Sequence, residues 1–239
     1  LGPITAHRVG VEGSVSGNTL TAKPSSLSPG SLYKTVLSST NIKDVSNNSL
    51  EQEYIWYFTT IYDSSEENTV IGSDGITKVV IPEGALTADG YVAINIDPVS
   101  SATLATPAEL EQARGAALTT EDPYVFPINS TMKEFVVYTG SNTIFGDALL
   151  NKRCTVYLPY PDADNDRFVD GTYPPVNQEN LVLYYFNTGT KRWIAADNIN
   201  IDRNSKVISA SVSRLSILVL MGRMNPGLKD AYAYPVPFM

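Results

Sequence analysis

The chain has 239 residues, of which 17 are basic and 25 acidic, giving a formal net charge of −8. Its single histidine, His7, and single cysteine, Cys154, exclude an intrachain disulfide and a zinc site built from histidine and cysteine. The acidic balance, with no cluster of lysine or arginine, argues against nucleic acids and anionic membranes as partners. The longest strongly apolar stretch, residues 215–221, is far shorter than the roughly 20 residues of a membrane-spanning helix.

Strand signals dominate the sequence. Short segments in which apolar and polar residues alternate are separated by glycine and proline, and this pattern predicts an all-β fold. The first such segments are residues 19–23, 32–37 and 54–58. Alternation places one face of each strand on a core and the other in water. We therefore expect residues 1–61 to form part of a β-sandwich.

This first region resembles the second half of the Ig-like repeats of bacterial S-layer and adhesin proteins. The resemblance covers about a quarter of the chain and is carried by Asn18-Thr-Leu-Thr, Leu27-Ser-Pro-Gly, Ile42-Lys-Asp44 and the closing Trp56-Tyr-Phe-Thr-Thr60. An Ig-like domain has about 100 residues, whereas only about 60 are present here. The first strands are expected to be missing, and we predict that an upstream segment or a strand from a neighbouring chain completes the sheet.

A second run of alternating segments follows a polar linker at residues 62–68 and predicts a larger sandwich over residues 66–223, with seven to nine strands. The expected strand segments are 77–82, 91–96, 135–138, 154–159, 181–186, 192–195, 207–212 and 217–221.

One short helix is expected near residues 107–114. Thr106 can cap it, Pro107 suits its first position, and Glu109 completes a capping box with Thr106. Gly115 is expected to end it.

The second region resembles the sandwich domain shared by zona-occludens proteins, ankyrins and netrin receptors, whose bacterial relatives lie beside Ig-like repeats in long surface proteins. The resemblance is carried by Ile81-Pro-Glu-Gly-Ala-Leu86, Asn180-Leu-Val-Leu-Tyr-Tyr185 and Trp193-Ile194. Residues 233–238 resemble the first strand of a small sandwich appended to many bacterial secreted proteins. We therefore expect residues 224–239 to be a linker and the first strand of a following domain, in a chain that is a piece of something longer.

The sharpest local pattern is an aspartate-rich segment that reproduces ligand positions 1, 3, 5, 7 and 9 of a calcium loop, where a hard cation takes six to eight oxygens. Several carboxylates this close together repel one another unless a cation is bound. The alternative is a solvated acidic turn. The predicted Ca²⁺ ligands are Asp162, Asp164, Asp166, the Phe168 carbonyl and Asp170, with Glu179 closing the shell from outside the loop.

This segment departs from an EF-hand at two positions. Arg167 occupies the sixth position, where glycine is usual, and Tyr173 occupies the twelfth, where a bidentate glutamate is usual. The loop resembles more closely the calcium loops of dockerins and thrombospondin-type repeats.

Routes to catalysis are few. Some animal relatives of the zona-occludens-type domain cleave their own chain at His-Phe-Ser, but here Arg214 stands in the place of that histidine, so Ser216 is expected to be a strand residue. Arginine stays protonated and cannot act as a base. His7 has no nucleophile motif nearby, and Cys154 is expected to be a small core residue. We therefore expect that this chain is not an enzyme.

The sequence as a whole predicts a non-catalytic structural or adhesive module of a bacterial extracellular or cell-surface protein. We expect it to be stabilised by calcium and assembled with neighbouring domains or identical subunits through edge strands. The alternative is a carbohydrate-binding accessory module of a secreted enzyme, in which aromatic rings stack on sugars. The candidate rings are Tyr57, Tyr138, Tyr157, Tyr160, Tyr184, Tyr185, Tyr232 and Tyr234.

Overall fold

The computed structural model describes residues 10–16, 19–25, 27, 32–39, 43–44, 46–120, 125–139 and 148–223. These residues form strands for the most part, which confirms the predicted all-β class. One α-helix and two short 3-10 helices, η1 (Asn129–Thr131) and η2 (Gln178–Asn180), complete the described part. His7 and residues 224–239, with the strand expected there, lie outside it.

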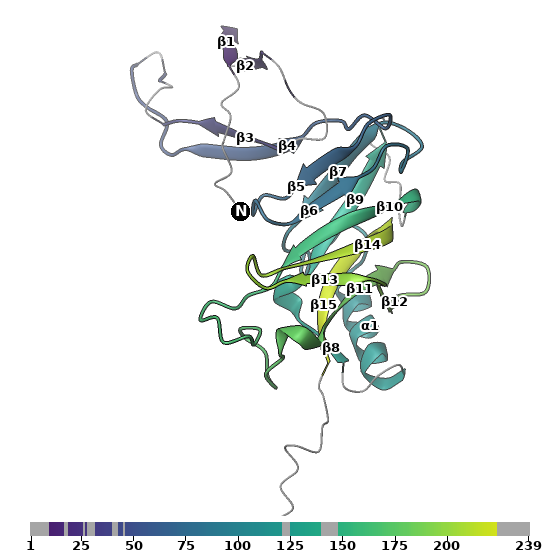
Figure 1. Ribbon diagram of the computed structural model, residues 1–239. Helices are drawn as coiled ribbons and strands as arrows, with labels where there is room; N and C mark the ends of the chain where they lie inside the picture. Colours follow the sequence, from purple (N-terminus) through teal and green to yellow (C-terminus); the bar gives the residue numbers. More distant parts are fainter. Residues whose placement is uncertain are drawn as a thin grey trace, which may run out of the picture.

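The first region forms two separate antiparallel hairpins (Figure 1, top). The first pairs β1 (Val11–Ser16) with β2 (Thr19–Pro24), and the second pairs β3 (Leu32–Leu37) with β4 (Tyr54–Thr59). Each hairpin is a sheet of only two strands.

The second region is a sandwich of two antiparallel sheets (Figure 1). The five-stranded sheet has the order β13-β14-β10-β6-β5. Its strands are β5 (Asn68–Ile71), β6 (Lys78–Ile81), β10 (Ala148–Pro159), β13 (Ile199–Asp202) and β14 (Val207–Leu215).

The other sheet has the order β12-β11-β15-β9-β7, and β8 also pairs with β15. Its strands are β7 (Gly90–Asn95), β8 (Val125–Pro127), β9 (Lys133–Thr139), β11 (Leu181–Asn187), β12 (Arg192–Ala195) and β15 (Ile217–Arg223).

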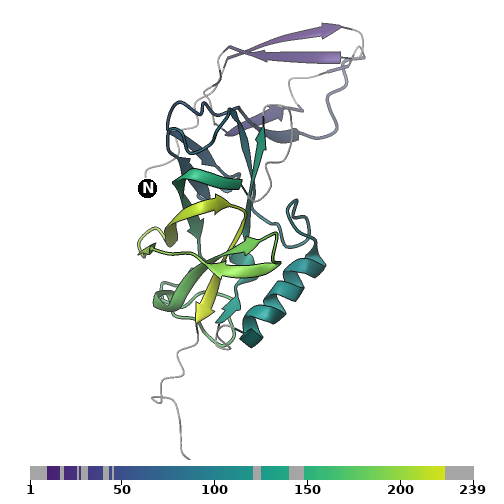
Figure 2. The same cartoon turned by 90° about the vertical axis from the view of Figure 1, so that its right-hand side faces the viewer.

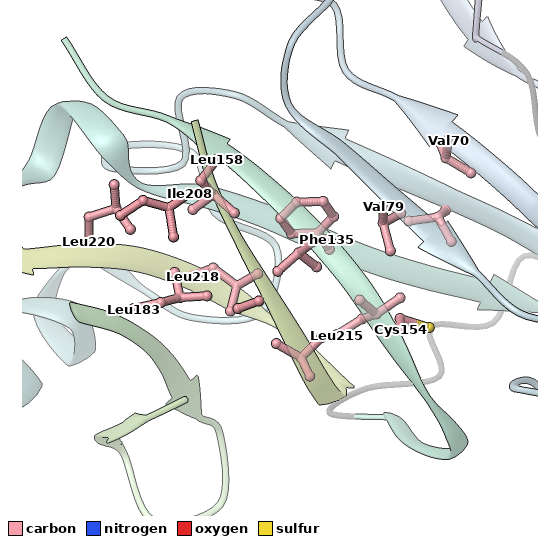
Figure 3. Packing of buried hydrophobic residues seen from close by; sticks show 14 of the residues in the cluster. Val70, Val79, Phe135, Cys154, Leu158, Leu183, Ile208, Leu215, Leu218 and Leu220 are labelled. Atoms are coloured by element: carbon pink, nitrogen blue, oxygen red, sulfur yellow. The ribbon is translucent and has the colours of Figure 1, made fainter. Parts of the chain in front are cut away.

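The main core lies between these two sheets (Figure 3). Alternate residues of β10 and β14, among them Leu158 and Ile208, meet alternate residues of β9, β11 and β15, among them Phe135, Leu183 and Leu220. All five of these side chains are fully buried. The alternation read from the sequence therefore identifies the inward face of these strands.

The outward face of the six-stranded sheet is covered by α1 (Pro107–Thr120), which lies along the side of the sandwich (Figure 2). Leu110 and Ala113 of the helix belong to a second apolar cluster with Phe186, Trp193 and Val219. Strand β15 is thus buried on both faces, and this explains the continuous apolar run at residues 217–221.

The helix begins as predicted but ends later. The Thr106 amide donates to Glu109 Oε2 at 2.9 Å, and the Glu109 amide donates to Thr106 Oγ1 at 3.3 Å, so the capping box is present. The predicted end at Gly115 is wrong, because the helix continues to Thr120. One internal glycine costs only about 1 kcal/mol relative to alanine, and alanine and leucine follow it at 116–118.

The sandwich differs from expectation at its start and in its strand count. The hydroxyl of Tyr62 donates to the Ala88 carbonyl at 2.9 Å and its ring is buried in the core, so the packed structure begins inside the expected linker. Eleven strands are described where seven to nine were expected. The additional strands, β5, β8 and β13, have only three or four residues, so their alternation is weak. The equally short β6 and β12 were predicted, β6 within the longer run 77–82.

Candidate metal centre

The aspartate-rich segment lies in the connection between β10 and β11, and buried residues hold it at both ends. The Tyr160 hydroxyl donates to Gln178 Oε1 at 2.6 Å, and both residues are buried. Within the loop, the Val169 amide donates to the Val176 carbonyl at 2.9 Å, and both valines belong to the main core. The loop is therefore anchored to the core of the sandwich.

The backbone of the loop coils tightly around its aspartates. Asp164 Oδ1 accepts from the Asp166 amide at 3.2 Å, and Asp166 Oδ1 accepts from the Phe168 amide at 2.7 Å. The intervening residues, Asn165 and Arg167, have φ angles of 62° and 75°. Each of these non-glycine residues adopts the left-handed conformation, which the local aspartate hydrogen bonds stabilise.

This coiling gathers three of the predicted ligands. Asp162, Asp164 and Asp166 each present a carboxylate oxygen that lies within 4.8 Å of the other two. Asp164 and Asp166 are exposed, whereas Asp162 is only 5% exposed. The group thus has one buried wall and one side open to solvent.

The buried wall has an unsatisfied oxygen. Asp162 Oδ1 is buried and has no hydrogen-bond partner among the described residues. Burying a polar atom without a partner is costly, and native proteins almost always satisfy such atoms. A buried carboxylate oxygen beside two further carboxylates is what a bound cation would satisfy.

The other three predicted ligands, Asp170, Phe168 and Glu179, are not members of the three-carboxylate group. Asp170 Oδ2 accepts from the Ala163 amide at 2.6 Å, which closes the loop on itself. Phe168 lies between Asp166 and Asp170 in the chain, and the residue is 41% exposed. Glu179 instead forms an ion pair with Arg203 at 2.8 Å and does not belong to the three-carboxylate group.

Lys206 is a residue that sequence reasoning missed. Its ammonium donates to the main-chain carbonyl of Asp162, and its own carbonyl accepts from the Tyr160 amide at 3.0 Å. It lies in the turn between β13 and β14, 44 residues from Asp162. No spacing in the sequence signals this contact, which depends on the pairing of β14 with β10.

The two candidate nucleophiles, Ser216 and Cys154, are both buried in the core. Ser216 is fully buried, and its hydroxyl donates to the Phe186 carbonyl at 2.6 Å. Burial raises the pKa of the Cys154 thiol to about 12, so the nucleophilic thiolate is suppressed. Cys154 is thus a core residue, as predicted. Ser216 is buried as well, but it lies between the end of β14 at Leu215 and the start of β15 at Ile217, so the prediction that it is a strand residue is wrong by one position.

The candidate tyrosines do not share one platform. Tyr160 and Tyr184 are buried, so their rings are not available for stacking on a sugar. Tyr138 stacks on Tyr91 with ring centroids 4.6 Å apart, while Tyr157 lies on the other sheet beneath the Lys78 ammonium. The side chains of Tyr57, Tyr232 and Tyr234 lie outside the described set.

The comparisons with known proteins support the first region. A sequence model of the bacterial Ig-like domain family matches residues 4–60, which contain both hairpins. This match agrees with the Ig-like resemblance and indicates a domain type found in bacterial surface proteins. A search of the curated proteins finds no match.

The match does not extend to the second region, so the zona-occludens-type resemblance stays a prediction.

In the described part of the chain, no helix is both long and apolar enough to cross a membrane. Bacterial Ig-like domains of this kind are typically non-catalytic, in line with the buried, structural surroundings of Cys154 and Ser216.

Proposed function

We propose that this chain is a non-catalytic structural or adhesive module of a bacterial extracellular protein, and that its larger sandwich binds one Ca²⁺ at the aspartate-rich loop. The observation that carries the metal proposal is the buried, unpartnered Oδ1 of Asp162 beside Asp164 and Asp166. The Ig-like match supports the surface-protein setting.

Calcium suits these ligands better than other common cations. It takes six to eight oxygens in flexible geometry, whereas Mg²⁺ requires a near-ideal octahedron. The proposed protein ligands are Asp162, Asp164, Asp166, the Phe168 carbonyl and Asp170, with water at the open side. Glu179 would join them only by leaving Arg203. One ion would change the formal net charge from −8 to −6.

Calcium would stabilise the sandwich because the loop and the core are connected. Val169 and Val176 belong to the core, and Tyr160 and Gln178 join the two ends of the loop. A ligand that binds only the folded loop stabilises the whole domain, by about 2.7 kcal/mol at a hundred times its dissociation constant. The proposed role is mechanical: a stiffened sandwich that joins or projects other domains.

Assembly is proposed to use strand edges. Strands β5 and β13 end one sheet, and β7 and β12 end the other. An edge strand presents unpaired backbone groups to which a neighbouring domain or identical subunit can add a strand. The two-stranded hairpins offer further edges of this kind.

Isothermal titration calorimetry on the chelator-treated chain tests the metal proposal. We expect one Ca²⁺ to bind and the melting temperature to rise with calcium, and Asp162→Asn to abolish both effects. Asp197→Asn is the matched control, because Asp197 is an exposed aspartate in the turn between β12 and β13. The absence of binding at millimolar calcium, or an unchanged response of Asp162→Asn, would overturn the proposal.

A further inference from the structure

Gly222 of β15 is packed against Val176 of the aspartate-rich loop, with no room for a side chain at position 222. A β-carbon there would lie 2.9 Å from Val176 Cγ1, 3.2 Å from Val176 Cβ and closer still to Val176 Cγ2. Carbon atoms in protein interiors pack at about 3.5–4.0 Å. Only glycine therefore fits at this position of β15 while Val176 keeps its place.

Neither side of this contact can easily give way. Gly222 is held between two strands, since it pairs with Leu181 of β11 and with Phe126 of β8. Val176 is 2% exposed and belongs to the main core. Its branched side chain has few allowed rotamers, and both of its methyl groups lie against Gly222. A larger residue at position 222 would thus displace the backbone of Val176.

The backbone of Val176 is bonded to the part of the loop that carries proposed ligands. Its carbonyl accepts from the Val169 amide at 2.9 Å. Its amide donates to Thr172 Oγ1 at 3.1 Å, and the same hydroxyl donates to the Val169 carbonyl at 2.7 Å. Val169 stands in the chain between two proposed ligands, the Phe168 carbonyl and Asp170. A displacement of Val176 would therefore reach both ligands through Val169.

We infer that Gly222 is a positioning residue for the calcium site. Its missing side chain lets Val176 pack on β15, and this contact fixes the two ligands on either side of Val169. Gly222 acts through Val176 and not by contact with the ion. The inference rests on the proposed calcium site. Because such coupling is reciprocal, bound calcium in turn stabilises the contact between the loop and the end of β15.

A positioning role predicts a loss of calcium affinity, whereas a purely structural role predicts only a loss of stability. Val92→Ala is the matched control, because Val92 of β7 is fully buried in the same core. Strand β7 lies at the opposite end of the sandwich from β8 and the end of β15 (Figure 1). Val92→Ala is expected to lower the melting temperature and to leave the calcium affinity within about twofold of the unchanged chain.

The test is calorimetric titration with calcium, together with thermal melting, of the full chain and its variants. Gly222→Ala is expected to bind calcium about tenfold more weakly, the equivalent of about 1.4 kcal/mol. Val176→Ala removes the two methyl groups that a β-carbon at position 222 would meet. Adding Gly222→Ala to that variant should therefore weaken binding by less than about twofold more. Such non-additivity shows that the two residues act through one contact.

The outcomes separate this inference from the proposal beneath it. If the unchanged chain binds no calcium, the proposed calcium site fails, and the inference fails with it. If the unchanged chain binds calcium and Gly222→Ala binds it within about twofold as tightly, the positioning role alone is overturned. The same conclusion follows if Gly222→Ala costs as much affinity in the Val176→Ala background as in the unchanged chain.

A further variant keeps the inference testable should Gly222→Ala not fold. Val176→Ile enlarges the other side of the same contact and is expected to weaken calcium binding. An unchanged calcium affinity in Val176→Ile would then overturn the positioning role.

Discussion

The two regions of this chain are built from the same kind of strand but reach different degrees of burial. The two tryptophans show the contrast, because Trp56 in β4 is 42% exposed while Trp193 in β12 is 3% exposed. In the sandwich, each apolar face meets a second sheet or α1. The hairpins are sheets of two strands, and Tyr54, Trp56 and Phe58 form an aromatic face that stays partly exposed.

The contrast teaches that alternation predicts a strand with an apolar face but says nothing of what covers that face. A single two-stranded hairpin is marginally stable in water, and additional strands or a packed second layer are needed for stability. The first region is therefore expected to contribute little stability of its own until another strand or sheet completes it.

The largest expected effect comes from removing one aromatic ring from each region. Phe135→Ala should lower the free energy of unfolding of the sandwich by about 3–5 kcal/mol, because it leaves a cavity in the core. Trp56→Ala should change it less, by about 1 kcal/mol, because this residue is 42% exposed and belongs to a sheet of only two strands. Urea unfolding followed by circular dichroism measures both, and equal losses would remove the distinction between the regions.

Alkaline pH should destabilise the sandwich next most strongly. Burial is the main reason that the pKa of the Cys154 thiol rises from 9.0 to about 12 and that of the Tyr62 hydroxyl from 10.0 to about 12. Because the neutral forms are the ones buried, their stabilisation is complete below pH 9 and is lost as the pH rises toward 12. Urea midpoints at pH 8, 10 and 11 should fall in sequence.

Cys154→Ala serves as the comparison for this prediction. It removes the thiol that titrates first, so the decline between pH 8 and 10 should be smaller than in the unchanged chain. A midpoint that is flat from pH 8 to 11 in the unchanged chain would show that neither buried group is linked to unfolding.

The smallest expected effect concerns the edge of the metal site. Asp164→Asn should weaken calcium binding about tenfold or more, because it removes a charged ligand from the gathered group. Glu179→Gln should change it by less than about twofold, because that side chain is paired with Arg203. Calorimetric titration of the two variants decides, and a larger loss for Glu179→Gln would place the glutamate in the calcium shell.

Much of the fold could be predicted from local pattern. The capping box at Thr106 and Glu109 marks where α1 starts, and alternation identifies the long core strands because their two faces differ. The short strands β5, β8 and β13 were not predicted, since three or four residues give only a weak alternation signal. The equally short β12 was predicted at residues 192–195, where Trp193 and Ile194 favour a strand. The predicted helix end at Gly115 was wrong because a helix with strong helix-forming residues on both sides tolerates one glycine.

In the candidate site, too, the local features could be predicted from the sequence and the long-range contacts could not. The spacing of Asp162, Asp164 and Asp166 is local, so the sequence alone identifies the group that the structure gathers. The contact of Lys206 with Asp162 and the pairing of Glu179 with Arg203 depend on β-sheet pairing and on loop placement across many residues. Such contacts are set by topology, which a single sequence does not display.

Hydrogen exchange of the full chain with and without calcium tests the account most directly, because it reports on both regions at once. Calcium is expected to slow exchange in the loop at residues 161–178 and in the adjoining strands β10 and β14, and to leave exchange in the hairpins β1–β2 and β3–β4 unchanged. Exchange in the loop that is the same with and without calcium would contradict it.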